Sequence, residues 1–174
     1  LYYTAGQPLM SALAEQTDCD CVMTRLFDEE IIDTHRESGP NSLRLAYGRG
    51  RSRPLFLGAA PKVILATLPK ARLKRLYENH AQELAGFPLS ATWEIFWETL
   101  QKTRKAGHYL SKGELEPSVG AIAVPFFDDG PQAVGALALV IPARRIEFMN
   151  YDKLLELLTS TARQLSHNVR QPGP

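Results

Sequence analysis

Four residues that could help to bind a ligand stand just before an apolar segment: Gly58, Ala59, Ala60 and Pro61. The first N–H groups of a helix lack intrahelical acceptors, and small side chains leave those groups accessible. Pro61 suits the first helical position, because its missing N–H has little effect there. The pattern predicts a helix over residues 61–68 whose start either binds an anion or only allows close packing.

No motif for catalysis accompanies this junction. The sequence has no Gly-x-Ser-x-Gly element, and its glycine- and arginine-rich loop lacks the Gly-Lys-Ser/Thr ending of a nucleotide P-loop. His108 is expected to be structural rather than a general base, because no partner is near in sequence. We therefore predict no enzyme activity, no metal and no cofactor. The histidines lack metal-ligand spacing and are His35, His80, His108 and His167.

Two cysteines, Cys19 and Cys21, alternate with Asp18 and Asp20. In a strand their side chains share one face, and they are too close in sequence to bridge each other. A reduced, buried pair is the expected reading, and a redox pair is the alternative.

Length and composition fit one globular domain. The chain has 174 residues, 44% of them hydrophobic and 22% charged, with a formal net charge of +1. This charge predicts no general attraction to nucleic acid or to an anionic membrane. Because no apolar stretch reaches the length of a membrane span, we expect a soluble, cytoplasmic protein.

Hydrophobic periodicity predicts the elements of the N-terminal two thirds. Helices are expected over residues 8–17, 61–68 and 70–84, and from Ser90 or Thr92 to Gly107. Strands are expected over residues 21–27, 31–36 and 43–47. The helix expected to end at Gly107 carries an aromatic stripe, which could be core, one wall of a cavity or a dimer face. The stripe consists of Trp93, Phe96, Trp97 and Leu100.

A second hairpin is predicted from residues 119–127 and 133–141, with Asp129-Gly130 as a two-residue turn. By strict pairing, Ala123 would face Ala136 and Ala121 would face Ala138. One face of this hairpin would carry small residues that either admit a close helix or leave a cavity. The other face would fill the main core with Ile122, Val124, Phe126, Leu137, Leu139 and Ile141. With a C-terminal helix from Asn150, these elements predict an α+β fold with a mostly antiparallel sheet and helices on its faces.

The segment Gly50 to Ala66 resembles the Gly-x-x-x-Pro-Leu-His-x-x-x-x-Gly-Lys-x-x-Leu-Ala signature of the C-terminal effector-binding domain of IclR-family transcription regulators. Residues 103–109, 113–114, 121–128 and 135–137 also follow that family's order and spacing. Phe56 replaces the usual His and Pro61 the usual Gly. The resemblance implies a GAF-like domain over residues 8–170, the end of a linker over 1–7 and a flexible tail over 171–174.

The resemblance also implies a site for a small carboxylate. The backbone N–H groups of Ala59 and Ala60 would hold the acid, and Arg53 would either clamp it or face solvent. The remaining positions that the resemblance places around the ligand are Leu45, Ser111, Val119, Ala121, Ala138 and Val140.

The implied function is effector binding and oligomerisation, as a homodimer or homotetramer. The ligand would be a small organic acid with an apolar or aromatic body, and it would modulate DNA binding by a winged helix-turn-helix module absent from these residues. No membrane partner is expected. Two alternatives stay open, a GAF-like redox sensor or enzyme using Cys19 and Cys21, and a dimerisation domain without a ligand.

Overall fold

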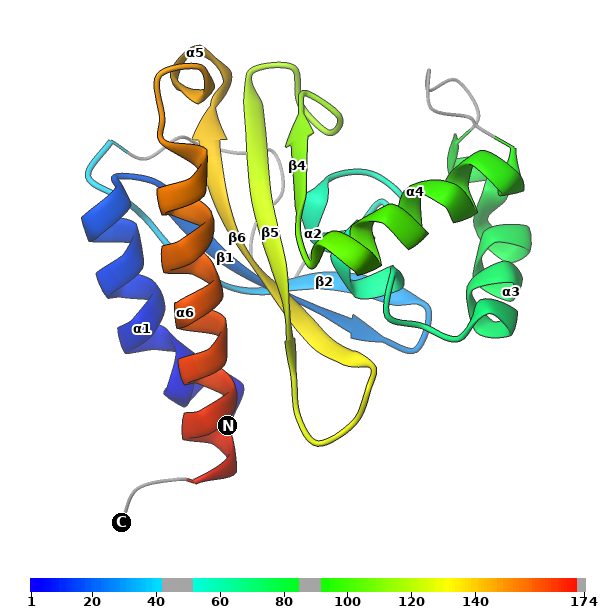
Figure 1. The fold of residues 1–174 in the computed structure, drawn as a ribbon, viewed down its shortest axis with the longest axis horizontal. Coiled ribbons are helices and arrows are strands. Elements are labelled where there is room, and N and C mark those ends of the chain that lie inside the picture. The colour runs from blue at the N-terminus through cyan, green and yellow to red at the C-terminus, as the bar shows by residue number, and fades with distance from the viewer. Residues whose placement is uncertain (42–51, 85–91, 172–174) are drawn as a thin grey trace.

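The computed structural model describes residues 1–41, 52–84 and 92–171, which form one antiparallel sheet between two helical layers (Figure 1). The α+β class and the mostly antiparallel sheet are therefore confirmed. The strands lie in the order β3-β2-β1-β6-β5-β4, with β1 Asp20–Phe27, β2 Glu30–Glu37, β3 Ser52–Arg53, β4 Tyr109–Lys112, β5 Val119–Phe127 and β6 Ala133–Pro142. The helices are α1 Tyr2–Thr17, α2 Ala59–Leu65, α3 Lys70–His80, η1 Ala81–Leu84, α4 Trp93–Ala106, α5 Ala143–Ile146 and α6 Tyr151–Arg170.

Helices α1 and α6 cover one face of the sheet and enclose the largest apolar core. The six bulky hairpin side chains expected there are all buried in this core, together with Met10 and Met23 from α1 and β1. Alternation along β5 and β6 predicted this face correctly, because successive side chains of a strand point to opposite sides.

Helix α2 covers the other face, with α3 and α4 beyond it (Figure 1). The small side chains of Ala123, Ala136 and Ala138 pack directly against α2, where they meet Ala59, Ala60, Val63 and Ile64. Methyl groups let a helix backbone approach a sheet closely, so this part of the small-residue face is filled by the protein itself.

The predicted hairpin register is wrong by two residues. Ala123 pairs with Ala138 instead of Ala136, and Ala121 pairs with Val140 instead of Ala138. The connection is longer than the two residues expected, because the Asp128 side chain accepts a hydrogen bond from Gly130 N (3.0 Å) and the ladder is irregular between Phe126 and Phe127. A shift of two residues preserves which side chains share a face, so the face assignment survives the error.

Two helix starts differ from the expected ones. Helix α1 begins at Tyr2, so most of the segment predicted as the end of a linker is helical, with Pro8 inside the helix. Tertiary contacts favour this extension, since the Tyr2 ring lies 5.4 Å from that of Phe126 and Gly6 packs against Met23. Helix α2 begins at Ala59, which makes Pro61 its third residue.

The other described helices follow the predictions from capping. Thr92 caps α4 by accepting a hydrogen bond from Ile95 N, Gly107 ends α4 at φ 78°, and Asn150 caps α6 through Lys153 N. The aromatic stripe is mainly core, because the Phe96 ring packs edge-on to Phe56 at 5.1 Å. The strand predicted over residues 43–47 lies outside the described residues. Within the described ranges, no helix combines the length and apolarity needed to cross a membrane.

Candidate functional site

The start of α2 is built from backbone and small side chains. Gly58 precedes it at φ 92°, a conformation that strongly favours glycine, and Ala59 and Ala60 are each 1% exposed. Because Pro61 has no N–H, Ala59 and Ala60 carry the N–H groups of the first three helical residues. The two donors that the sequence proposed therefore stand at the helix start.

The sheet brings three of the predicted site residues into one row. Ser111 on β4 pairs with Ala121 on β5, and Ala121 pairs with Val140 on β6. Val119 lies two residues before Ala121 and so shares its face. Ser111 and Val140 are buried, whereas Val119 and Ala121 are half-buried, so the exposed end of the small-residue face lies here. Ala138 lies in the next row, under α2.

A buried lysine fixes the loop before α2. Lys62 is 4% exposed, and its Nζ donates to the carbonyl oxygens of Phe56 (3.3 Å) and Gly58 (3.2 Å). The Gly58 carbonyl and the Ala59 N–H belong to the same planar trans peptide and point in opposite directions. The hydrogen bond from Lys62 to the Gly58 carbonyl therefore holds the Ala59 N–H in an orientation that points away from the Lys62 ammonium.

The Lys62 charge is balanced by the loop after β4. Glu114 forms an ion pair with Lys62 and accepts a hydrogen bond from the Tyr109 hydroxyl (2.9 Å). The Lys62 ammonium also lies 4.7 Å from the centre of the Tyr109 ring. Burial, and then the negative charge of Glu114, raise the pKa of Tyr109, so the phenol stays protonated and donates.

Two charged residues that sequence reasoning missed lie at the end of the same row. Asp20 on β1 pairs with Val140, and its carboxylate accepts from Arg36 Nε (3.0 Å) and Gly39 N (2.9 Å). Arg36 pairs with Val22, which places it beside this part of the sheet face. The alternation of Asp20 with the cysteines was visible in the sequence, but only the sheet order shows that Asp20 adjoins Val140.

Two other predicted site residues are placed only in part or not at all. The backbone of Arg53 pairs with Ile31 in β3, and its side chain lies outside the described part of the structure. Leu45 lies outside the described residues. Their roles toward a ligand stay predictions.

The cysteines and histidines do not form a reactive centre in the described part of the chain. Cys19 and Cys21 are buried free thiols, and burial raises the pKa of both. His108 accepts or donates at Nδ1 to the Tyr151 hydroxyl (2.6 Å) as a structural pair. The described residues hold no group of three or more side chains suited to bind a metal ion.

Comparison with known proteins assigns the family. Residues 3–167 match the family described as "Bacterial transcriptional regulator IclR C-terminal". The HTH-type transcriptional regulator KdgR of Escherichia coli is 25% identical over 141 residues, which cover 81% of this chain and 54% of KdgR. The HTH-type regulator XynR of the same organism is 29% identical over 130 residues, which cover 74% of this chain and 52% of XynR.

The fold comparison agrees. The crystal structure of the transcriptional regulator YaiJ superimposes with a TM-score of 0.88 at 23% identity, covering 97% of this chain and 94% of that one. The GAF-like fold is thereby confirmed. The chain spans about half the length of the curated relatives that it matches. The family description and the names of these relatives are those of transcriptional regulators, in agreement with the prediction that the domain is not an enzyme. The chain belongs to the IclR family of bacterial transcriptional regulators and corresponds to the family's C-terminal domain.

Proposed function

We propose that this domain binds a small organic acid at the start of α2 and thereby modulates DNA binding by an N-terminal winged helix-turn-helix module. The observation that carries the proposal is the fixed peptide at Gly58 and Ala59, which Lys62 orients from the buried side. Preorganised N–H groups at a helix start suit a carboxylate, because they need no rearrangement when the ligand binds.

The side chains around these N–H groups favour a ligand with an apolar body. Val119, Ala121 and Val140 offer only carbon atoms, and Ser111 adds one hydroxyl. Burying a polar group without a hydrogen-bond partner costs about 1–3 kcal/mol of free energy. An aromatic acid therefore fits this surface better than a sugar acid with many hydroxyls.

A cation would complete the site. Arg53 is the residue that the sequence proposes, with Leu45 as part of the apolar wall. Arg36 is a second candidate, because it already pairs with Asp20 at the end of the row. A ligand carboxylate bound near Asp20 would form an ion pair with the Arg36 guanidinium, whose forked donors can pair with two carboxylates.

Binding alters regulation only if the acid binds two states of the protein unequally. We propose that these states are two arrangements of subunits in a cytoplasmic homodimer or homotetramer. Sedimentation velocity with and without ligand measures the assembly. DNA titrations with a chain extended to include the upstream module measure the coupling.

Isothermal titration calorimetry tests the ligand class. Benzoate and 4-hydroxybenzoate are compared with glyoxylate and glucuronate, and we expect an aromatic acid to bind most tightly. Tighter binding of glyoxylate or glucuronate than of any aromatic acid contradicts the proposed pocket.

Substitution of Ala121 by Phe tests the location. Ala121 is half-buried, so a larger side chain can enter the proposed ligand space without overpacking the core. We expect A121F to lose binding. Substitution of Ala81 by Phe is the matched control, since Ala81 is also half-buried but lies in η1. Unchanged affinity in A121F places the ligand elsewhere. Failure of all acids to bind, together with a stable dimer, supports the dimerisation alternative.

A further inference from the structure

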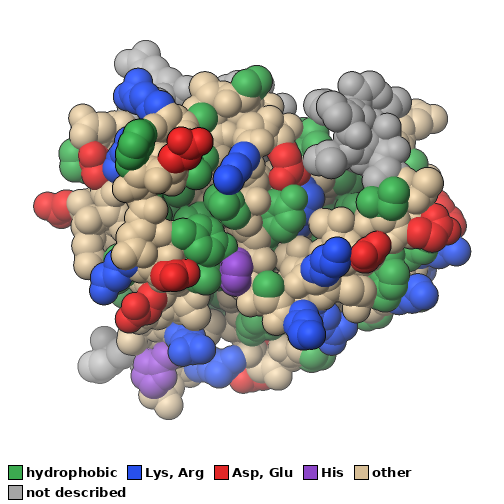
Figure 2. Space-filling view, turned by 45° about the horizontal axis from the view of Figure 1, so that its top comes forward, with side chains coloured by type: hydrophobic (Ala, Val, Ile, Leu, Met, Phe, Trp, Pro, Cys, Tyr) green, Lys and Arg blue, Asp and Glu red, His purple; other side chains and the backbone are tan. Residues whose placement is uncertain are grey.

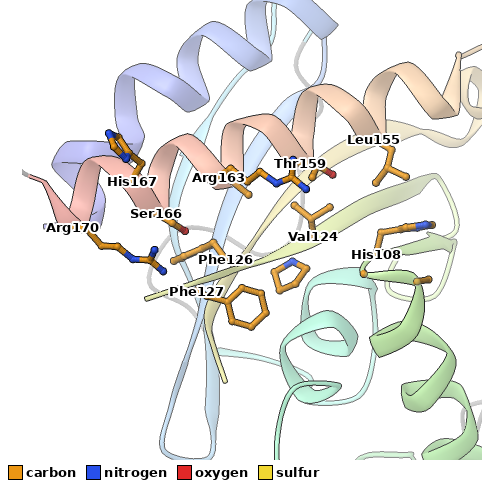
Figure 3. A pocket seen from close by; sticks show the side chains of 14 residues that line it. His108, Val124, Phe126, Phe127, Leu155, Thr159, Arg163, Ser166, His167 and Arg170 are labelled. Carbon is orange, nitrogen blue, oxygen red and sulfur yellow. The ribbon is translucent and has the colours of Figure 1, made fainter. Parts of the chain in front are cut away.

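A second concave site lies where the last part of β5 forms the edge of the sheet, and residues from both faces of β5 line it. It is a groove of about 630 Å³ between α6 and β5, next to the turn that joins α4 to β4. Strand β4 begins at Tyr109 opposite Ala123, so β5 extends past β4 from Val124 onward. The groove follows this extended part of β5 (Figure 3).

The ionisable side chains that line the groove are all basic. Of its fourteen lining residues, two are Arg, two are His and none is Asp or Glu. Figure 3 shows Arg163 and Arg170 extending from α6 over Val124 and Phe126, with Phe127 below them. Figure 2 shows blue and purple side chains together at the lower left of the view, with red side chains beside them. The groove therefore combines an apolar floor with a cationic rim.

The two arginines differ in their partners. Arg170 donates to the Asp128 carbonyl oxygen and lies 3.4 Å from the Asp129 carboxylate. Arg163 is exposed and makes no hydrogen bond or ion pair with the described residues. Arg163 is thus available to an anion without breaking a contact, and Thr159 and Ser166 add hydroxyls beside it.

The shape excludes one kind of occupant and fits another. An added β-strand is disfavoured, because Pro125 in the middle of the extended edge has no N–H to donate. A volume of several hundred Å³ with an apolar floor and a few polar groups is typical of small-molecule sites. Guanidinium groups at the rim select a carboxylate or sulfonate.

We propose that the groove between α6 and β5 is a second small-molecule site of this domain, and that it binds an organic anion with an aromatic or aliphatic body. The anionic group of the ligand forms an ion pair with Arg163. It also competes with the Asp129 carboxylate for the neighbouring Arg170 guanidinium. The body lies on Pro125, Phe127 and Leu155, the half-buried apolar residues of the lining. This site is distinct from the one at the start of α2, since its lining includes no residue of α2 and none of the row formed by Ser111, Ala121 and Val140.

The proposal is tested by fluorescence titration with two probes that share a ring system. The anion is 8-anilinonaphthalene-1-sulfonate, and the neutral probe is N-phenyl-1-naphthylamine. We expect Arg163→Glu to weaken binding of the sulfonate at least tenfold and R163E/R170E to weaken it further, while the neutral probe changes less than twofold. Circular dichroism confirms that each variant is folded.

The matched control is R144E/K153E, which makes the same change in net charge at exposed positions outside the groove. We expect it to bind the sulfonate as the unaltered chain does. The proposal is overturned if the unaltered chain does not bind the sulfonate, if R163E leaves its affinity unchanged, or if the control weakens it equally. The proposal is also overturned if R163E lowers the affinity for the sulfonate and for the neutral probe by the same factor.

Crystals soaked with 4-bromobenzoate locate the anion directly. An anomalous bromine peak between α6 and Phe127 supports the second site. Bromine only at the start of α2 overturns it while supporting the effector site, and bromine at neither place contradicts both.

Discussion

The Nζ atom of Lys62 lies 3.2 Å from the carbonyl oxygen of Gly58, so a buried charge holds the peptide that carries the Ala59 N–H. Lys62 stands one turn into α2, and its partner Glu114 comes from the loop after β4. The pair thus fastens the helix start to the sheet edge. This makes Lys62 a positioning residue for the proposed effector site, although it need not touch the ligand.

Substitution of Lys62 by Met is expected to destabilise the domain by about 3–5 kcal/mol, because it leaves the Glu114 carboxylate buried without its partner. The double variant K62M/E114Q should recover part of this loss, since it removes both charges. Urea unfolding measures the free energies. Equal stability of the single and double variants would contradict a coupled pair. Calorimetry on the folded double variant should still show weaker acid binding, because the Gly58 peptide is released.

Substitution of Gly58 by Ala is expected to destabilise the domain by about 1–3 kcal/mol, because a side chain is strained at φ 92°. Gly130→Ala is the control: Gly130 is exposed, and an added Cβ would meet its nearest neighbour at an ordinary 3.7 Å. Thermal unfolding compares the two variants. A Gly58 variant as stable as the Gly130 variant would argue against the backbone described before α2.

Substitution of Ala138 by Leu should destabilise the domain by about 1–3 kcal/mol, because the extra carbon atoms must enter the close contact between β6 and α2. Ala121→Leu is the matched comparison, since Ala121 lies on the same face but is half-buried. We expect a clearly smaller loss of stability there, measured by urea unfolding. If both variants lose the same stability, the room proposed beside Ala121 is absent.

The buried thiols predict a loss of stability at alkaline pH. Burial raises the pKa of Cys21 and Cys19 above the value of about 8.5 expected in the unfolded chain. Above that pH the unfolded chain releases these protons first, so this contribution to stability is complete below pH 8.5 and declines as the pH rises.

Urea unfolding from pH 7 to pH 10 measures the decline, and Cys21→Ala should make it shallower. A thiol-specific disulfide reagent at pH 8 gives a second measurement. We expect both thiols to react slowly in the native protein and rapidly in urea. Rapid native reaction would instead favour the redox alternative.

Local patterns in the sequence determined much of the architecture. Capping residues set both ends of α4 and the start of α6, because Thr92, Gly107 and Asn150 act on backbone groups close to them in sequence. Alternation in β5 and β6 determined which side chains face the core. The start of α1 at Tyr2 was not predictable in this way, since contacts with Phe126 and Met23 outweigh the signal of Pro8.

The same distinction between local sequence signals and tertiary contacts applies to the candidate site. The sequence by itself proposed Ala59, Ala60, Ser111 and Ala121, because small residues before a helix and a resemblance to a family depend only on residue type and spacing. Only the tertiary structure showed that Lys62 and Glu114, 52 residues apart, form a buried pair, and that Asp20 adjoins Val140. The physical reason is that a charge is stable inside a protein only beside its partner, and partners distant in sequence meet only when the sheet order and register bring them together.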